Sequence, residues 1–558
     1  MAAIAAREHA RTSWAVAAAL FGLVVAAGIL LRFENLGGKV FWQDEAYTAL
    51  HATGHLDRGD LRPLFDGRIR TAGELRRLQR LDPHRGAGAA IAAIAAEDSD
   101  QGALYYLLER VAIQADGGSI VSFRVAGAVL GVLSIAAGFG LAWELFGSLG
   151  TAAIFAAILA LSPFEVLYAH EARSYTLTVL MTLGTSHLFL RAVRARTAAG
   201  WALYGIAMAA GLYASLLLAI VAASHWCYSL LRRKDQGRAY LWCLGALALS
   251  LLLYAPWIAV LAAHRGMVNT ELDWGGTPYP LRLMAVKWLY NASAQFFDLE
   301  WLSLAFAPVG ALFLCLTAAS LYVARKYAAP AQWQFIAVMA VLPAALFIGR
   351  DAVEHAHWST IARYLIPTWL ALQLAVAFTL WRLCAPKEGR GTIAAAGAGT
   401  LAAVLLLEGV SSAINTRAAS WYNDQNSAAT PPIAAAVNAS PHPLLIGEKA
   451  WAFFLDASNY LRPDVHLELF ADARHATIVT GGYSDVFVPT PSAALAQALA
   501  RQGYTLRQVY AYTGNAAPYA AFHRDLQKNG PKKLPVNASV SFPDYLYSAE
   551  RPGTQRSK

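Results

Sequence analysis

Residues 125–164 have the sequence VAGAVLGVLSIAAGFGLAWELFGSLGTAAIFAAILALSPF, in which Glu144 is the only charged residue. A helix of about 20 apolar residues crosses a bilayer, because the hydrocarbon core is about 30 Å thick and each residue rises about 1.5 Å. These residues are long enough for two crossings, Val125 to Trp143 and Leu145 to Phe164. The stretch therefore predicts an α-helical membrane protein.

The rest of the chain repeats this pattern. Further apolar runs without charge occupy Trp14 to Leu31, Ser174 to Leu190, Thr197 to Leu231, Ala239 to Ala263, Trp301 to Ala324, Tyr327 to Gly349, Tyr364 to Trp381 and Gly391 to Leu407. The run from Thr197 to Leu231 is too long for one crossing, so we expect a hairpin near Gly211 to Ser215. This gives about eleven spans. The first run exceeds the core of a signal peptide, so we expect it to remain as an anchor.

Composition excludes other classes of protein. Charged residues make up 15% of the 558 residues and hydrophobic residues 57%, whereas a soluble domain carries about 25% charged residues. The four cysteines all lie in or beside apolar runs, which excludes a disulfide scaffold.

The basic residues indicate the topology of the chain. Short cytoplasmic loops are enriched in Lys and Arg. With eleven spans and a cytoplasmic N-terminus, the basic clusters all fall on the cytoplasmic side: Arg7 and Arg11; Arg191, Arg194 and Arg196; Arg232, Arg233, Lys234 and Arg238; Arg325 and Lys326; Lys387 and Arg390. The net charge of +9 therefore marks membrane topology, and we expect membrane lipids and no nucleic acid as partners.

The long polar segments then lie on the outer face. We expect a transmembrane domain at residues 1–411, with an outer loop at 32–119 that contains interfacial helices, and a small soluble α/β domain at 412–558. In this tail, strands are expected at Pro443 to Ile446, Val465 to Phe470 and Thr477 to Thr480, and helices at Lys449 to Leu461 and Ser492 to Gln502.

Two adjacent acids, Asp44 and Glu45, follow the first span among aromatic residues. Neighbouring side chains point to different faces of a helix, so the two acids need not share a task. The simpler interpretation is an interfacial aromatic belt with a helix N-terminus, whose dipole favours acids. The functional interpretation is a pair of catalytic carboxylates at the bilayer surface.

A second group, His170, Glu171, Arg173 and Tyr175, lies between two spans on the same face. Ionisable groups between membrane helices are costly unless they pair or serve a function. An ion pair between Glu171 and Arg173 that closes the turn is the alternative. Carboxylates with a nearby guanidinium suit a reaction that deprotonates an acceptor and stabilises a leaving phosphate.

Two further groups are expected on the outer face. Before the span at Tyr364 lie Asp351, Glu354, His355, His357 and Arg363. Their spacing matches no metal motif and favours a solvated loop, while Arg363 either binds an anionic head group or extends to the interface. In the outer loop, residues 97–108 place Asp98 ahead of an aromatic helix containing Tyr105. This helix either lies on the membrane surface or is only capped by the acids.

Taken together, these motifs resemble a known family. They are Trp-x-Asp-Glu-Ala-x-Thr at Trp42 to Thr48, Leu104-Tyr105-Tyr106 after an acid, Ser162-Pro163-Phe164 through Glu171-Ala172-Arg173-Ser174-Tyr175, and Arg363-Tyr364-Leu365-Ile366-Pro367. Their order resembles the integral-membrane glycosyltransferases of the C superfamily, in the group of protein O-mannosyltransferases and aminoarabinose-lipid A transferases. Gln101-Gly102-Ala103 stands where His-Pro-Pro is common in that group.

The resemblance implies an inverting enzyme of the bacterial inner membrane that moves a sugar from a polyprenyl-phosphate carrier to a lipid, glycan or protein acceptor. It implies Asp44 as the base, supported by Glu45, with Glu171 as the second acidic group. It also implies a carrier-phosphate site and an acceptor or loop site. The phosphate site comprises Arg173, Tyr175, Arg363 and Tyr364, and the acceptor or loop site comprises Asp98, Tyr105 and His170.

A divalent cation stays open as a cofactor, with Glu45 and Glu171 as candidate ligands. A flippase or transporter of lipid-linked saccharides is the alternative from another class, although it would need ionisable groups at mid-depth of the spans, which are nearly free of them. A polymerase or ligase of such saccharides is the third interpretation.

Overall fold

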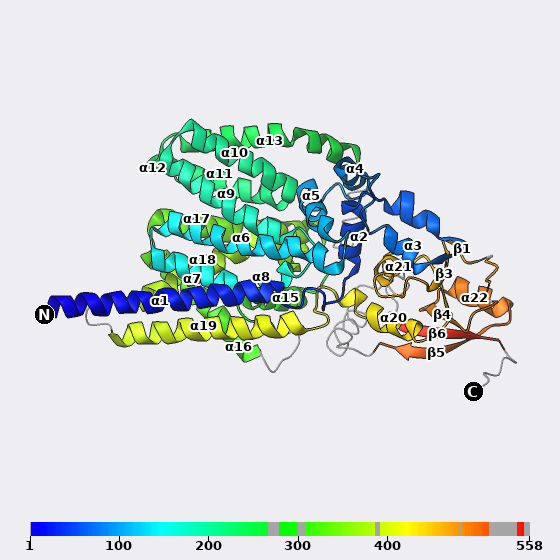
Figure 1. Ribbon diagram of the computed structural model, residues 1–558. Helices are drawn as coiled ribbons and strands as arrows, with labels where there is room; N and C mark the ends of the chain where they lie inside the picture. Colours follow the sequence, from blue (N-terminus) through cyan, green and yellow to red (C-terminus); the bar gives the residue numbers. More distant parts are fainter. Residues whose placement is uncertain are drawn as a thin grey trace. The chain divides into compact units, whose positions relative to one another are not determined.

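The computed structural model describes residues 2–265, 278–299, 307–385, 391–474, 476–479, 481–512 and 544–551 (Figure 1). Contacts between Cα atoms divide the chain into two compact units. We call Met1–Leu36, Ser99–Tyr105 and Arg124–Arg417 the helical unit, and Gly37–Asp98, Tyr106–Phe123 and Ala418–Lys558 the sheet unit. Because the outer loop is shared between them, the units cut across the expected boundary at residue 411.

Eight helices of the described residues are long and apolar enough to cross a membrane. They are α1 (Ala2–Phe33), α6 (Ile120–Phe146), α9 (Tyr175–Ala195), α13 (Ala239–Ala263), α16 (Ala307–Tyr327), α17 (Pro330–Glu354), α18 (Ile366–Cys384) and α19 (Gly391–Arg417). A ninth crossing results if α7 (Leu149–Leu161) and α8 (Pro163–Ala169), which are bent by 53° relative to each other, form one span. The chain is thus a multi-pass membrane protein.

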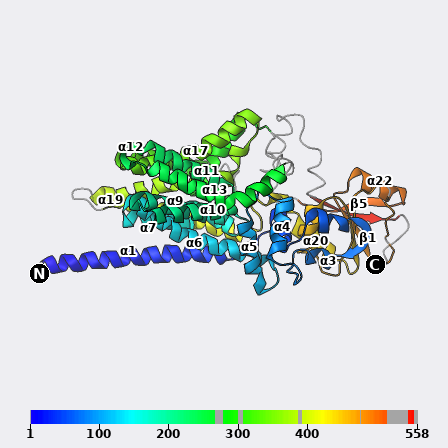
Figure 2. The ribbon, with the colours of Figure 1, turned by 90° about the horizontal axis from the view of Figure 1, so that it is seen from above.

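The expected hairpin is present as α10 (Ala198–Ala214) and α11 (Leu217–Leu231), which separate at Ser215. Helices α9, α10, α11 and α13 pack side by side in Figures 1 and 2. Both hairpin helices are shorter than the eight long ones, so length alone supports eight or nine crossings, and the expected eleven requires both short helices to span. The expected starting point Trp301 and the basic residues Lys387 and Arg390 lie outside the described residues.

Helix α7 ends where Pro163 follows Ser162, because proline has no N–H with which to continue the helix ladder. Arg32 of α1 then donates hydrogen bonds to the terminal carbonyl oxygens of Leu159 and Ala160, at 2.7 and 2.6 Å. A helix end buried in a membrane needs such partners for its carbonyl groups. The break in this span is therefore stabilised by a buried cation.

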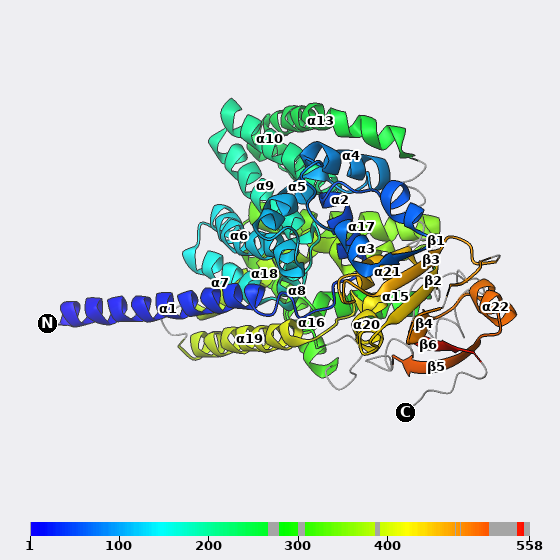
Figure 3. The same cartoon turned by 45° about the vertical axis from the view of Figure 1, so that its right-hand side comes forward.

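The described residues of the sheet unit form six strands in the order β1-β3-β2-β4-β6-β5 (Figure 3). They are β1 (Asp66–Thr71), β2 (Pro443–Glu448), β3 (His466–Phe470), β4 (Asp485–Pro489), β5 (Thr505–Ala511) and β6 (Tyr545–Glu550). Strand β2 runs parallel to β3 and β4, and the other pairings are antiparallel. One face carries an apolar core against α22 (Ala493–Arg501), with Leu444, Val488 and Leu499 fully buried.

Two of the strands expected in the tail are confirmed as β2 and β3, and the two expected helices as α21 (Trp451–Ala457) and α22. The expected strand at Thr477 to Thr480 is wrong: residues 477–479 are irregular, and Thr480 lies outside the described residues. The backbone N–H of Val479 instead bonds to the buried carboxylate of Glu468. Strand β1 comes from the outer loop, where its short and largely polar sequence gave no strand signal.

Candidate active site

Asp44 and Glu45 lie in the first turn of α2 (Gln43–Ala52), in the sheet unit. The Glu45 carboxylate is fully buried and accepts a hydrogen bond from the N–H of Trp42 at 3.2 Å. Glu45 therefore caps the helix that it belongs to, as the simpler interpretation of this motif expected. Asp44 is only half-buried, so the side chains of the two neighbouring acids lie in different surroundings.

The start of α2 is held by residues of the C-terminal part of the unit. The N–H of Val40 donates to the Ala419 carbonyl at 2.8 Å. The N–H of Phe41 donates to the hydroxyl of Tyr460 at 2.5 Å, and that of Gln43 to the hydroxyl of Ser427 at 3.1 Å. Since Trp42 donates to Glu45, each backbone N–H from residue 40 to residue 43 has a partner.

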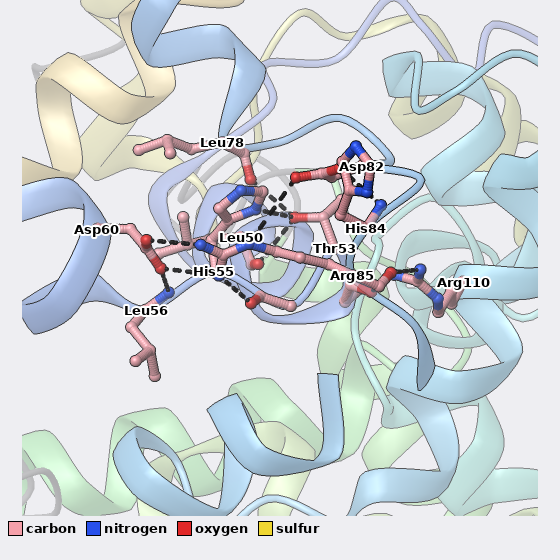
Figure 4. Close-up of polar contacts among 12 residues, drawn as sticks. Leu50, Thr53, His55, Leu56, Asp60, Leu78, Asp82, His84, Arg85 and Arg110 are labelled. Atoms are coloured by element: carbon pink, nitrogen blue, oxygen red, sulfur yellow. Dashed lines mark hydrogen bonds and ion pairs between the residues drawn. The ribbon is translucent and has the colours of Figure 1, made fainter. Parts of the chain in front are cut away.

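The other end of α2 is held by outer-loop residues, which Figure 4 shows. The Thr53 hydroxyl donates to the Leu78 carbonyl at 2.7 Å, and Arg110 donates to the Ala52 carbonyl at 3.0 Å. These bonds satisfy the last carbonyl groups of the helix or tie its end to the following loop. Helix α2 is thus anchored at both ends.

Arg85 reinforces this second anchor. It donates to the Gly54 carbonyl at 2.7 Å and forms a two-pronged ion pair with Asp60, at 2.9 and 3.1 Å (Figure 4). Burial alone would raise the pKa of Asp60, but the Leu56 N–H and the Arg85 guanidinium hold it below its usual value. Burial and the nearby Arg85 also lower the pKa of His55, which favours its neutral form.

A buried imidazole, that of His51, lies on α2 seven residues after Asp44. Its Nε2 is 3.4 Å from Glu97 Oε2, and its Nδ1 is 3.9 Å from Asp98 Oδ2. Asp98 also accepts a hydrogen bond from the Tyr106 hydroxyl at 2.9 Å. His51 belongs to none of the motifs described above, although a spacing of seven residues places it on the same helix face as Asp44.

Glu97 ends α4 (Ala87–Glu97), and Asp98 is the C-cap residue of that helix. Because α5 (Ala103–Ala112) begins only at Ala103, none of Asp98, Ser99 and Asp100 is its N-cap, and the capping alternative is wrong. Burial would raise the pKa of Glu97, but the nearby His51 imidazole and hydrogen bonds from the N–H groups of Arg58 and Asp57 lower it. The Glu97 carboxylate is thus kept ionised next to an imidazole.

The helical unit brings together the four residues expected to bind phosphate. The guanidinium carbon of Arg173 lies 5.8 Å from the centre of the Tyr175 ring, and that of Arg363 lies 5.4 Å from the same ring. Arg363 is also 5.6 Å from the Tyr364 ring. Two cations beside one aromatic ring form a site that an anion with several oxygen acceptors would stabilise.

The loop before Arg363 is ordered by Asp351. Its two carboxylate oxygens accept hydrogen bonds from the N–H groups of Trp358 and Ser359, at 2.6 and 2.8 Å. The Trp358 ring then packs 5.8 Å from Tyr364, while Glu354 pairs with Arg350. Asp351 and Glu354 therefore have structural partners, and His357 stacks on Tyr279 at 3.8 Å between ring centres.

The remaining expected residues are buried in the helical unit. His170 Nε2 hydrogen-bonds to the Leu31 carbonyl at 2.7 Å, which ties the turn before α9 to the end of α1. Glu171 is buried, and α6 approaches its backbone so closely that a Cβ on Gly127 would lie 2.8 Å from the Glu171 carbonyl oxygen. The Tyr105 side chain is fully buried.

Residues 101–103, where Gln-Gly-Ala replaces the His-Pro-Pro that is common in the resembling group, have a structural role. A Cβ on Gly102 would lie 2.0 Å from the Tyr213 carbonyl oxygen, so this position requires glycine. Gln101 forms an isolated backbone bridge with Ser215 at the turn between α10 and α11. Within the ranges given above, no group of three His, Cys, Asp or Glu side chains has a geometry that would hold a metal ion.

The arrangement of helices and sheet is the glycosyltransferase C fold, as the motifs predicted. The chain is similar to the crystal structure of ArnT from Cupriavidus metallidurans bound to undecaprenyl phosphate, with 14% identity and a TM-score of 0.54 over 89% of this chain and 96% of that one. It is also similar to the archaeal oligosaccharyltransferase AglB from Archaeoglobus fulgidus in complex with an inhibitory peptide and a dolichol-phosphate. That match has 12% identity and a TM-score of 0.51, over 97% of this chain and 89% of that one. No protein-family model and no curated protein matches the chain.

Proposed function

We propose that the protein is a membrane glycosyltransferase that moves a sugar from a polyprenyl-phosphate carrier to a lipid, glycan or protein acceptor on the outer face of the membrane. The observation that carries this proposal is the convergence of Arg173 and Arg363 on the Tyr175 ring. The fold supports it, because two proteins with this fold were solved with a polyprenyl-type phosphate bound.

In the proposed reaction, Asp44 removes a proton from the acceptor, and the acceptor attacks the anomeric carbon of the sugar. The bond between that carbon and the carrier phosphate oxygen breaks, and its electron pair leaves with the phosphate. Arg173 and Arg363 stabilise the charge on the leaving phosphate, with Tyr175 and Tyr364 supporting them. A single displacement of this kind inverts the anomeric centre.

The other expected residues take supporting roles in this proposal. Glu45 holds the first turn of α2, Glu171 is the second acidic group, and Asp98, Tyr105 and His170 belong to the acceptor or loop site. A divalent cation is the candidate cofactor in this proposal, because its charge would add to that of the two arginines at the leaving phosphate. Dialysis of the purified protein against a chelator, followed by addition of Mg²⁺ or Mn²⁺, tests that cofactor directly.

The function is tested by incubating purified protein with polyprenyl-phosphate sugars and following loss of donor and release of carrier phosphate. We expect turnover that falls about 100-fold or more in Asp44→Asn, because removal of a general base has that effect. Full turnover in this variant would overturn the assignment of the base. Movement of intact donor across liposome membranes without bond cleavage would show that the protein is a flippase and not a glycosyltransferase.

A further inference from the structure

We propose that the C-terminal part of the sheet unit positions the catalytic helix α2, with Tyr460 and Ser427 as the positioning residues. This inference rests on the proposed function, in which Asp44 is the base. It assigns a task to residues 418–512 that neither the fold nor the motifs assign.

The contacts are concentrated at one point of the chain. Phe41 and Gln43 donate their backbone N–H groups to the side-chain hydroxyls of Tyr460 and Ser427. Asp44 follows Gln43 directly, so a shift of these amide groups moves its carboxylate. Because misplacement of a catalytic group by about 1 Å costs about 100-fold in rate, two such bonds are enough to control the reaction.

The backbone at Tyr460 and at Ser427 is itself held in place. The Tyr460 carbonyl accepts a hydrogen bond from the Asn438 side chain at 2.9 Å, and Asn438 also accepts one from the Arg462 N–H at 2.8 Å. The Ser427 N–H donates to the Asp424 carbonyl at 3.0 Å. The helix α21 that precedes Tyr460 also packs against α2. The two hydroxyls that bond to α2 therefore belong to residues whose backbone is anchored.

The amide groups of Phe41 and Gln43 are backbone donors at the start of a helix, where no intrahelical partner exists. Without Tyr460 and Ser427 they would have to bond to water, and the first turn of α2 would gain freedom. Loss of one such bond costs about 1.4 kcal/mol, which corresponds to about tenfold in rate if the whole effect falls on the positioning of Asp44.

The test compares Tyr460→Phe and Ser427→Ala with matched controls in the same part of the chain. The controls are Tyr483→Phe, whose hydroxyl bonds to His466, and Ser440→Ala, whose hydroxyl bonds to Ser484 and Asp485. We expect kcat to fall about tenfold in each of the two test variants, with the KM for the donor unchanged. Ser427→Thr keeps a hydroxyl and is expected to restore kcat.

Hydrogen exchange gives a second readout that does not depend on activity. The amides of Phe41 and Gln43 are expected to exchange faster in Tyr460→Phe and Ser427→Ala, respectively, and at the wild-type rate in the controls. Unchanged kcat and unchanged exchange in both test variants would overturn the positioning role. The proposed function would be overturned instead if the wild-type protein did not consume the donor. Faster exchange in the two variants would in that case still show that Tyr460 and Ser427 anchor α2.

Discussion

Arg363 lies over the rings of Tyr175 and Tyr364, at 5.4 and 5.6 Å from their centres. The Arg-Tyr-x-x-Pro motif placed it before a late span, and the structure places it next to Tyr175, nearly 190 residues earlier in the chain. No pattern of spacing connects the two residues. Only the packing of α18 near α9 brings Arg363 to Tyr175.

Replacement of Arg363 by alanine is expected to raise the KM for the polyprenyl-phosphate donor about 10- to 100-fold, since a charge-assisted hydrogen bond contributes about 1.5 to 3 kcal/mol. The measurement is donor consumption at varied donor concentration. Arg382→Ala is the matched control, because Arg382 also lies over an aromatic ring, that of Tyr327 at 4.0 Å, but belongs to no proposed site. An equal KM for the donor in the two variants would show that Arg363 does not bind the donor phosphate.

Helix α1 shows how an element depends on close packing. Its apolar run predicted a span. The sequence did not predict that this span packs so closely against the end of α7 that no side chain fits at Gly28. A Cβ on Gly28 would lie 2.4 Å from the Ala160 carbonyl oxygen, while nothing lies within 4 Å of such an atom on Gly22 of the same helix. Packing of this kind is invisible in a sequence that consists largely of small apolar residues.

Gly28→Ala is therefore expected to destabilise the protein by about 1 to 3 kcal/mol, as overpacking does. Gly22→Ala makes the same chemical change in open surroundings and is expected to leave stability unchanged or slightly raised. Thermal unfolding of both variants in detergent provides the comparison. Equal midpoints would show that α1 can move away from α7 at no cost.

At the scale of the whole molecule, most of the outer loop belongs to the same sheet unit as the tail. Strand β1 of the loop pairs with β3 of the tail, Leu467 lying opposite Arg70 and His466 opposite Thr71. The tail is thus part of the same fold as the segment that carries Asp44. Truncation would remove more than an appended domain.

A chain that ends at Arg417 is expected to expose its outer loop, because β1 loses its partner strand and the amides at the start of α2 lose theirs. Trypsin should cut rapidly at Arg68 and Arg70, which lie in β1. Cleavage at Arg232 and Arg233 of the helical unit serves as the internal reference and should not change. Equal cleavage of β1 in the full and truncated chains, identified by mass spectrometry, would refute this dependence.

The sequence by itself determined that the chain is an α-helical membrane protein with this fold, and it named most of the residues proposed for the site. Each of these depends on local properties: a run of apolar residues must cross the bilayer as a helix, and short motifs carry their own chemistry. The tertiary structure decided the membership of the sheet, the anchoring of α2, the place of His51 beside Glu97, and the meeting of Arg173 and Arg363 at Tyr175. These depend on contacts between residues far apart in the chain, and such contacts follow from packing rather than from any local pattern.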